Sequence, residues 1–121
     1  SVGPTEYDFG DERITLNAWH QDQVVEKPQG AEVVASTDFC ANAALLYDDR
    51  IFSVQPHPEF RKEFMEGLIK YRGPGLVPEG TLAEATARID TQLDSPKMAD
   101  RIARFFLNHQ TKTTGAEKLR A

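Results

Sequence analysis

The chain changes from a strand-like to a helix-like residue pattern at Pro58, and this change limits the folds that it can adopt. Before Pro58, short apolar segments alternate with turn residues, as in β-strands, and the expected strands are 13–19, 31–36, 43–47 and 51–55. After Pro58, apolar residues recur at helical intervals. Strands followed by helices indicate either an α+β domain or part of a larger α/β domain, and the pattern alone does not separate the two.

Three helices are expected in the second half. The first spans Glu59–Tyr71 and ends before Gly73-Pro74-Gly75, and the second spans Thr81–Leu93. The third opens with Ser95 as its N-cap and Pro96 at its first helical position. The apolar faces are Phe60, Phe64, Leu68 and Tyr71 in the first helix, Leu82, Ala85, Ile89 and Leu93 in the second, and Met98, Ile102, Phe105 and Phe106 in the third.

Turn residues between the expected strands favour antiparallel pairing. Asp48-Asp49-Arg50 separates two apolar strand ends as a hairpin turn would, and 27–30 contains both Pro and Gly. Residues 111–121 are polar and lack periodicity, so we expect a flexible tail there after a domain that covers residues 1–110.

The charge balance argues against a nucleic-acid partner. The chain has 14 Lys and Arg against 19 Asp and Glu, a net charge of -5, and so offers no basic footprint for phosphate. It holds no apolar run of the length that a membrane helix needs, and residues 1–10 lack the features of a signal peptide. We therefore expect a cytoplasmic protein with no membrane partner.

The segment Gln55-Pro56-His57-Pro58-Glu59 is the strongest candidate for chemistry. Each proline fixes its own φ and biases the preceding residue towards an extended conformation, so His57 stands in a stiff loop just past a strand. A general base needs an imidazole and a group that orients its far nitrogen. Glu59, two residues away, can supply that group.

The run Val54-Gln55-Pro56-His57-Pro58-Glu59 resembles the "V-Q-x-H-P-E" signature of class I glutamine amidotransferases. The resemblance implies that His57 is the catalytic base and Glu59 its orienter in a Cys-His-Glu triad that hydrolyses L-glutamine through a glutamyl thioester. The family usually has Phe where this chain has Pro56, which leaves both chemical groups in register.

A second stretch, 17–24, is similar to the family's "H-x-D-x-V" strand and turn, whose backbone helps to hold glutamine. By this resemblance His20 and Gln21 are the candidate substrate-binding residues. The likeness extends over most of residues 1–110 and is nearest to the GMP-synthase-like, stand-alone branch. It implies an α/β fold, the C-terminal half of a flavodoxin-like amidotransferase domain, with short strands followed by three helices.

The family nucleophile is expected outside this sequence. It lies on a G-x-C-x-G elbow, and the chain holds no such elbow. Cys40 has no flanking glycine, so we expect a small buried residue there and not a nucleophile. The resemblance implies that a missing N-terminal half carries the cysteine, that this chain alone is inactive, and that a synthetase partner accepts the ammonia. No cofactor is implied.

Three alternatives stay open. A γ-glutamyl hydrolase could use the same triad on a peptide or conjugate, and a degenerate amidotransferase-like module could serve protein interaction only. A metal site is the third, since His20-x-Asp22 and His57-x-Glu59 offer two imidazoles and two carboxylates. Neither pair has the i, i+4 spacing of the familiar metal-hydrolase helix, so no metal is predicted.

Overall fold

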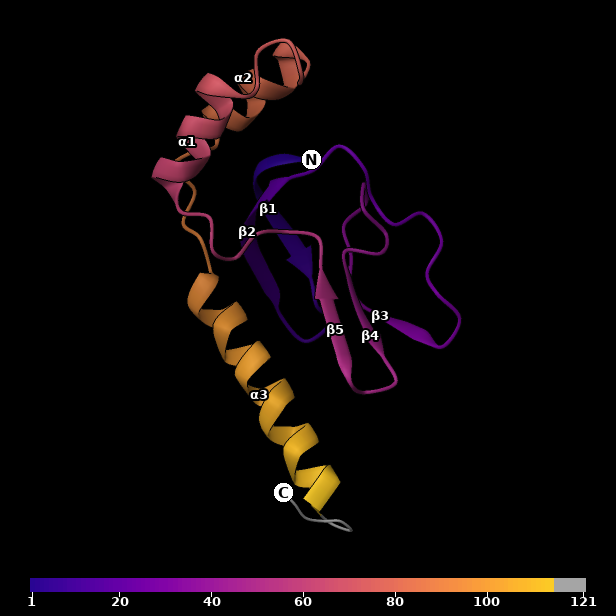
Figure 1. The fold of residues 1–121 in the computed structure, drawn as a ribbon. Coiled ribbons are helices and arrows are strands. Elements are labelled where there is room, and N and C mark those ends of the chain that lie inside the picture. Colours follow the sequence, from indigo (N-terminus) through magenta and orange to yellow (C-terminus); the bar gives the residue numbers. More distant parts are fainter. Residues whose placement is uncertain (115–121) are drawn as a thin grey trace.

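A computed structural model describes the backbone of residues 1–114 and the side chains of residues 1–108. Within these residues the fold is α/β, with two small antiparallel sheets followed by three helices (Figure 1). The strands are β1 (Val2–Asp8), β2 (Arg13–Trp19), β3 (Ala31–Ala35), β4 (Ala44–Tyr47) and β5 (Ile51–Val54), and the helices are α1 (Lys62–Tyr71), α2 (Glu79–Ala87) and α3 (Ser95–Thr114).

Strand β1, which the sequence analysis did not predict, pairs with β2 over its full length, from Val2 opposite Trp19 to Asp8 opposite Arg13. Gly3 and Pro4 obscure its pattern, since both residues are rare inside strands. The structure tolerates Pro4 because it lies at the outer edge of the sheet. There the guanidinium of Arg88 donates to the carbonyl oxygens of Val2 (3.0 Å) and Pro4 (3.2 Å).

The second sheet is antiparallel, in the order β3-β4-β5. The pairing expected across the turn at 27–30 was wrong, because β2 pairs with β1 and not with β3. Its second hairpin turns at Asp48 and Asp49, which both have positive φ (53° and 54°). The N–H of Arg50 donates to the carbonyl of Tyr47 at 3.0 Å and closes this turn. Two consecutive left-handed residues match the twist of the flanking strands, which confirms the hairpin expected here.

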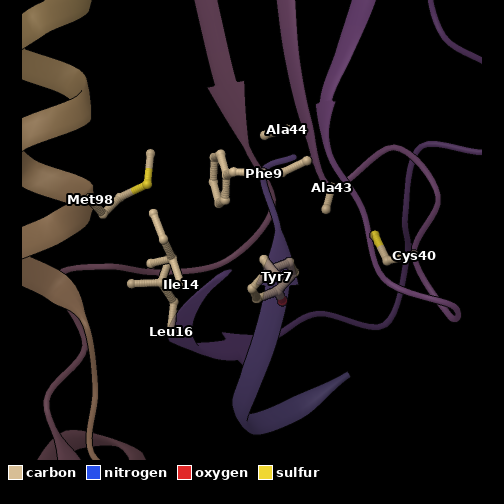
Figure 2. Packing of buried hydrophobic residues seen from close by; sticks show 9 residues of the cluster. Tyr7, Phe9, Ile14, Leu16, Cys40, Ala43, Ala44 and Met98 are labelled. Atoms are coloured by element: carbon tan, nitrogen blue, oxygen red, sulfur yellow. The ribbon is translucent and has the colours of Figure 1, made fainter. Parts of the chain in front are cut away.

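The core lies where both sheets meet α3, as Figure 2 shows. Tyr7 and Phe9 come from the first hairpin and its turn, Ile14 and Leu16 from β2, and Met98 reaches them from α3. Ile102 packs against the same cluster one turn further along α3. Burial of these apolar side chains holds α3 against the sheets, since such burial contributes about 25 cal/mol per Å².

The helix boundaries differ from the expected ones. Helix α1 begins three residues later than Glu59, because Glu59 and Phe60 belong to a turn that is bound to β2. Ser95 is helical, and Asp94 takes the N-cap place because its carbonyl accepts the first helical hydrogen bond, from the Met98 N–H (3.2 Å). Helix α2 starts at Glu79 and ends at Ala87, since the next residue, Arg88, turns to the edge of β1.

The expected apolar face of α1 was partly wrong. Phe64 and Tyr71 are 52% and 73% exposed, whereas Met65, outside that face, is fully buried. In α3, Met98 is buried as expected but Phe106 is 64% exposed. Helical spacing identified the helices, and it did not identify which of their large side chains meet other elements.

Helix α3 continues to Thr114, so residues 111–114 of the expected tail are helical. Residues 115–121 lie outside the described part of the chain, and the boundary at 110 therefore stays a prediction. Within the described residues, no helix combines the length and apolar character that crossing a bilayer requires.

Candidate active site

His57 lies in the loop that leaves β5 and leads to α1 (Figure 1). Its backbone N–H donates to the carbonyl of Asn17 in β2 at 2.8 Å, which forms an isolated antiparallel bridge between the two segments. Pro56, just before it, is buried. The extended backbone that Pro58 favours at His57 is the one that such a bridge requires. His57 is thus fixed to the first sheet as well as to the second.

The imidazole of His57 contacts the carboxylate of Glu59, with 3.0 Å between Nδ1 and Oε2. Partial burial of Glu59 raises its pKa, but hydrogen bonds from His57 and from its own backbone outweigh this effect, and the pKa lies below its usual range. Glu59 is therefore ionised at neutral pH and can only accept a hydrogen bond. In the neutral imidazole Nδ1 then carries the proton, and Nε2 keeps a free lone pair for use as a base.

The ring of Phe60 covers one face of the His57 imidazole. The two rings stack with their centroids 4.1 Å apart and their planes 5° from parallel, and Phe64 packs at a tilt on Phe60. The side chain of His57 keeps 35% of its surface exposed and that of Glu59 keeps 65%. The Phe60 ring thus packs on one face of the imidazole, and the His57–Glu59 pair remains partly exposed to solvent.

The structure places His20 directly after β2, where its Nδ1 lies 3.0 Å from the carbonyl oxygen of Asp22. Burial lowers the pKa of His20, with smaller contributions in the same direction from the Ser1 N-terminus and from His57. Gln21 is exposed. His20 and Gln21 together line a cleft of about 490 Å³, whose other walls include Phe39 and Leu76.

Cys40 lies in the core and is 1% exposed, which confirms the expectation of a buried residue. Burial raises the pKa of its thiol, so it is a poor source of thiolate. Among the described residues, no three His, Cys, Asp or Glu side chains gather closely enough to hold a metal ion. The two pairs weighed as a metal site therefore do not combine into one.

Comparison with known proteins gives three informative relatives. A glutamine amidotransferase-like protein of Schizosaccharomyces pombe is 32% identical over 100 residues, 82% of this chain and 40% of the relative. Gamma-glutamyl peptidase 3 of Arabidopsis thaliana is 39% identical over 65 residues, 50% of this chain and 26% of the relative. The glutamine-hydrolysing GMP synthase of Finegoldia magna is 49% identical over 41 residues, 33% of this chain and 8% of the relative.

The matches to glutamine amidotransferase-like proteins and to GMP synthases support the class I glutamine amidotransferase family. The chain spans only 40% of the length of the Schizosaccharomyces pombe relative, and smaller shares of the other two. No family model and no solved structure matches it. Five short strands in two sheets with three helices are consistent with part of the flavodoxin-like domain that this family implies.

Sequence reasoning missed two residues at this candidate site. Asn17 and Phe60 both contact the His57 segment, yet neither was assigned a role, although Asn17 is the first residue of the stretch 17–24. Phe60 offered a signal, since it directly follows the motif. Asn17 offered a weaker one, because it is a single amide in the otherwise apolar run Leu16 to Trp19.

Proposed function

We propose that the protein to which this chain belongs hydrolyses the γ-amide of glutamine, with His57 as general base and Glu59 as its orienter. The observation that carries the proposal is the contact of 3.0 Å between His57 Nδ1 and Glu59 Oε2, which leaves Nε2 as the free base. The nucleophile is a cysteine from outside these 121 residues, since the buried thiol of Cys40 does not suit the task.

The proposed reaction has two stages. The thiol proton passes to His57 Nε2 while the sulfur bonds to the γ-carbonyl carbon of the substrate. The C–N bond then breaks, the leaving ammonia takes the proton from His57, and a glutamyl thioester remains. Water attacks the thioester, His57 again accepts a proton and returns it to the sulfur, and glutamate leaves. Glutamine and water become glutamate and ammonia, and the enzyme is restored.

The same proposal assigns substrate contacts to the end of β2. His20 and Gln21 line the cleft at this end of the strand, where backbone and side-chain groups can meet the α-amino and α-carboxyl groups of glutamine. The released ammonia is proposed to pass to a synthetase partner. The glutamine-hydrolysing GMP synthase relative supports this idea through its name.

A second candidate is hydrolysis of γ-glutamyl peptides, which the relationship to gamma-glutamyl peptidase 3 supports. The bond chemistry is unchanged, and only the leaving amine differs. The cleft at His20 and Gln21 is open, so a longer substrate has room to lie along it. Substrate preference distinguishes the two candidates, because a glutaminase must reject an amine larger than ammonia.

The experiment compares the complete protein with its His57→Gln and Glu63→Gln variants on glutamine and on γ-glutamyl dipeptides. His57→Gln should reduce hydrolysis by roughly 10²-fold or more, because a general base is lost. Glu63→Gln should keep the rate, since Glu63 is exposed on the first turn of α1. A His57→Gln protein with the original rate would refute the proposal. A folded protein that hydrolyses neither substrate would favour a non-catalytic module.

A further inference from the structure

Asn17 is the one amide or charged side chain among the buried residues of the described chain, with 1% of its surface exposed. It lies in β2 between the buried apolar residues Leu16 and Ala18. A buried amide is unfavourable unless it is hydrogen-bonded, and an apolar side chain would fill the place at lower cost. Its polar character therefore calls for an explanation beyond packing.

Both hydrogen bonds of Asn17 to other segments go to the candidate active-site loop. Its backbone carbonyl accepts the N–H of His57 at 2.8 Å, and its side-chain Nδ2 donates to the carbonyl of Phe60 at 2.9 Å. The loop is closed on itself by the Phe60 N–H, which donates to the His57 carbonyl at 3.1 Å. One residue of β2 thus holds the first and the last residue of the turn His57–Phe60.

The register of β2 explains why Asn17 can do this. Asn17 and Thr15 direct their backbone groups away from β1, towards His57 and Asp94 respectively. The edge of β2 that faces away from β1 therefore binds two segments that are far apart in the sequence. On that edge, Asn17 binds the His57–Phe60 turn through its side-chain amide as well as through its backbone carbonyl.

The hydrogen bond from the Asn17 side chain to the Phe60 carbonyl affects the position of the His57 imidazole. Phe60 carries the ring that stacks on His57, so holding the Phe60 carbonyl sets the position of that ring. Glu59 stands between the two anchored residues and meets Nδ1 of His57. Release of the Phe60 end would free both the stacking ring and the carboxylate to move.

We propose that Asn17 is a positioning residue for His57, acting through the bond from its Nδ2 to the Phe60 carbonyl. This inference rests on the proposed function, in which His57 is the base. Asn17 itself does not touch the reacting atoms. Its contribution is to keep the imidazole in the orientation that leaves Nε2 pointed at the nucleophile.

The test uses Asn17→Ala, with Asn42→Ala as the matched control. The Nδ2 of Asn42 also donates to a backbone carbonyl at 2.9 Å, that of Val24, but not to the His57 loop. In the complete protein, Asn17→Ala should lower kcat by roughly 10- to 100-fold, because small misplacement of a catalytic group has effects of that size. KM should change little, and Asn42→Ala should change neither constant.

A second variant guards against loss of folding. Asn17→Leu keeps approximately the volume of the side chain and removes the donor without adding a charge, so it should also lower kcat. NMR of the complete protein gives a readout that is independent of activity. The nuclear Overhauser contacts between the His57 and Phe60 rings should weaken in both Asn17 variants and persist in Asn42→Ala.

The outcomes separate the two proposals. If His57→Gln abolishes hydrolysis while both Asn17 variants keep kcat and the ring contacts, the role of Asn17 is refuted and the proposed function stands. If His57→Gln keeps the rate, the proposed function has failed and this inference with it. Equal losses in Asn17→Ala and Asn42→Ala would also overturn the inference, because they would show only general destabilisation.

Discussion

The imidazole of His57 lies flat on the ring of Phe60, with 4.1 Å between centroids and 5° between planes. Such a pair contributes about 0.5–1.5 kcal/mol beyond the area that it buries. Replacement by leucine keeps an apolar side chain and removes the flat surface. Phe60→Leu should therefore lower kcat by roughly 2- to 10-fold, which is the same free energy expressed as a rate. Steady-state kinetics of the complete protein measures this.

The control for that prediction is Phe106→Leu, since Phe106 is 64% exposed on α3 and makes an edge-to-face contact with Phe105, away from His57. Its kcat should equal that of the parent. Equal rates in Phe60→Leu and the parent would show that the stacking does not orient the imidazole.

Glu59→Gln should lower kcat more strongly than Phe60→Leu. The amide has the shape of the carboxylate, but it lacks the charge and can present either a donor or an acceptor to Nδ1 of His57. The tautomer with a free Nε2 then loses its preference, and a loss of roughly 10²-fold or more is expected. The measurement is glutamine hydrolysis at neutral pH beside Glu63→Gln, which should be unaffected. A Glu59→Gln protein with unchanged kcat would contradict the orienting role.

The pH dependence of the pair has a definite sign. The folded pKa of Glu59 lies below its usual range, so its contact with His57 contributes stability above the unfolded value of about 4.3. That contribution is lost as the pH falls through the lower, folded pKa. Carbon-13 NMR of the Glu59 carboxyl should show the depressed pKa in the parent chain. In His57→Phe it should move upward, and an unchanged value would mean that His57 is not the cause.

Short-range relationships at the site were predictable from the sequence, and long-range ones were not. His57 and Glu59 are two residues apart in a loop stiffened by Pro56 and Pro58, so their contact follows from local geometry. The bond from Asn17 to Phe60 joins residues 43 positions apart. It depends on the side of β2 to which Asn17 points, which only the register of the sheet decides.

The same distinction holds for the fold. Strand β2 was predicted with its observed bounds, because apolar and β-branched residues fill it. Strand β1 was missed because Gly3 and Pro4 are rare inside strands. Arg88, the residue after the end of α2, donates hydrogen bonds to the outer edge of β1. The residue pattern predicts elements whose stability comes from their own sequence. It misses elements, such as β1, that depend on tertiary contacts.

Asp94 anchors α3 to the outer edge of β2. Its N–H donates to the Thr15 carbonyl at 2.7 Å, and its carboxylate accepts the Thr15 N–H at 2.8 Å. Asp94→Ala removes the second bond and leaves a strand N–H without that acceptor. The free energy of unfolding should fall by about 1–3 kcal/mol, measured by urea denaturation. Asp100→Ala, on the exposed surface of the same helix, should change it by less than about 0.5 kcal/mol.

Gly3 is required for two separate reasons, and a pair of variants can separate them. Its φ is +85°, a left-handed value that L residues avoid, and an added Cβ would lie 3.0 Å from the Cβ of Ala85 in α2. Gly10 has a similar φ of +88° but open space around its Cβ position. Gly10→Ala should therefore cost only the backbone strain, about 1–2 kcal/mol. Gly3→Ala should cost this amount plus the clash.

The clash can be tested directly with a double-mutant cycle. Ala85→Gly removes the methyl group that the new Cβ at position 3 would meet, so the double variant should regain part of the stability lost in Gly3→Ala. Contacting residues typically show coupling of about 0.5–3 kcal/mol, whereas distant ones are additive. Thermal or urea unfolding of the four proteins measures the coupling. Strict additivity of the two changes would mean that α2 does not press on β1 at Gly3, and that the cost of Gly3→Ala is backbone strain alone.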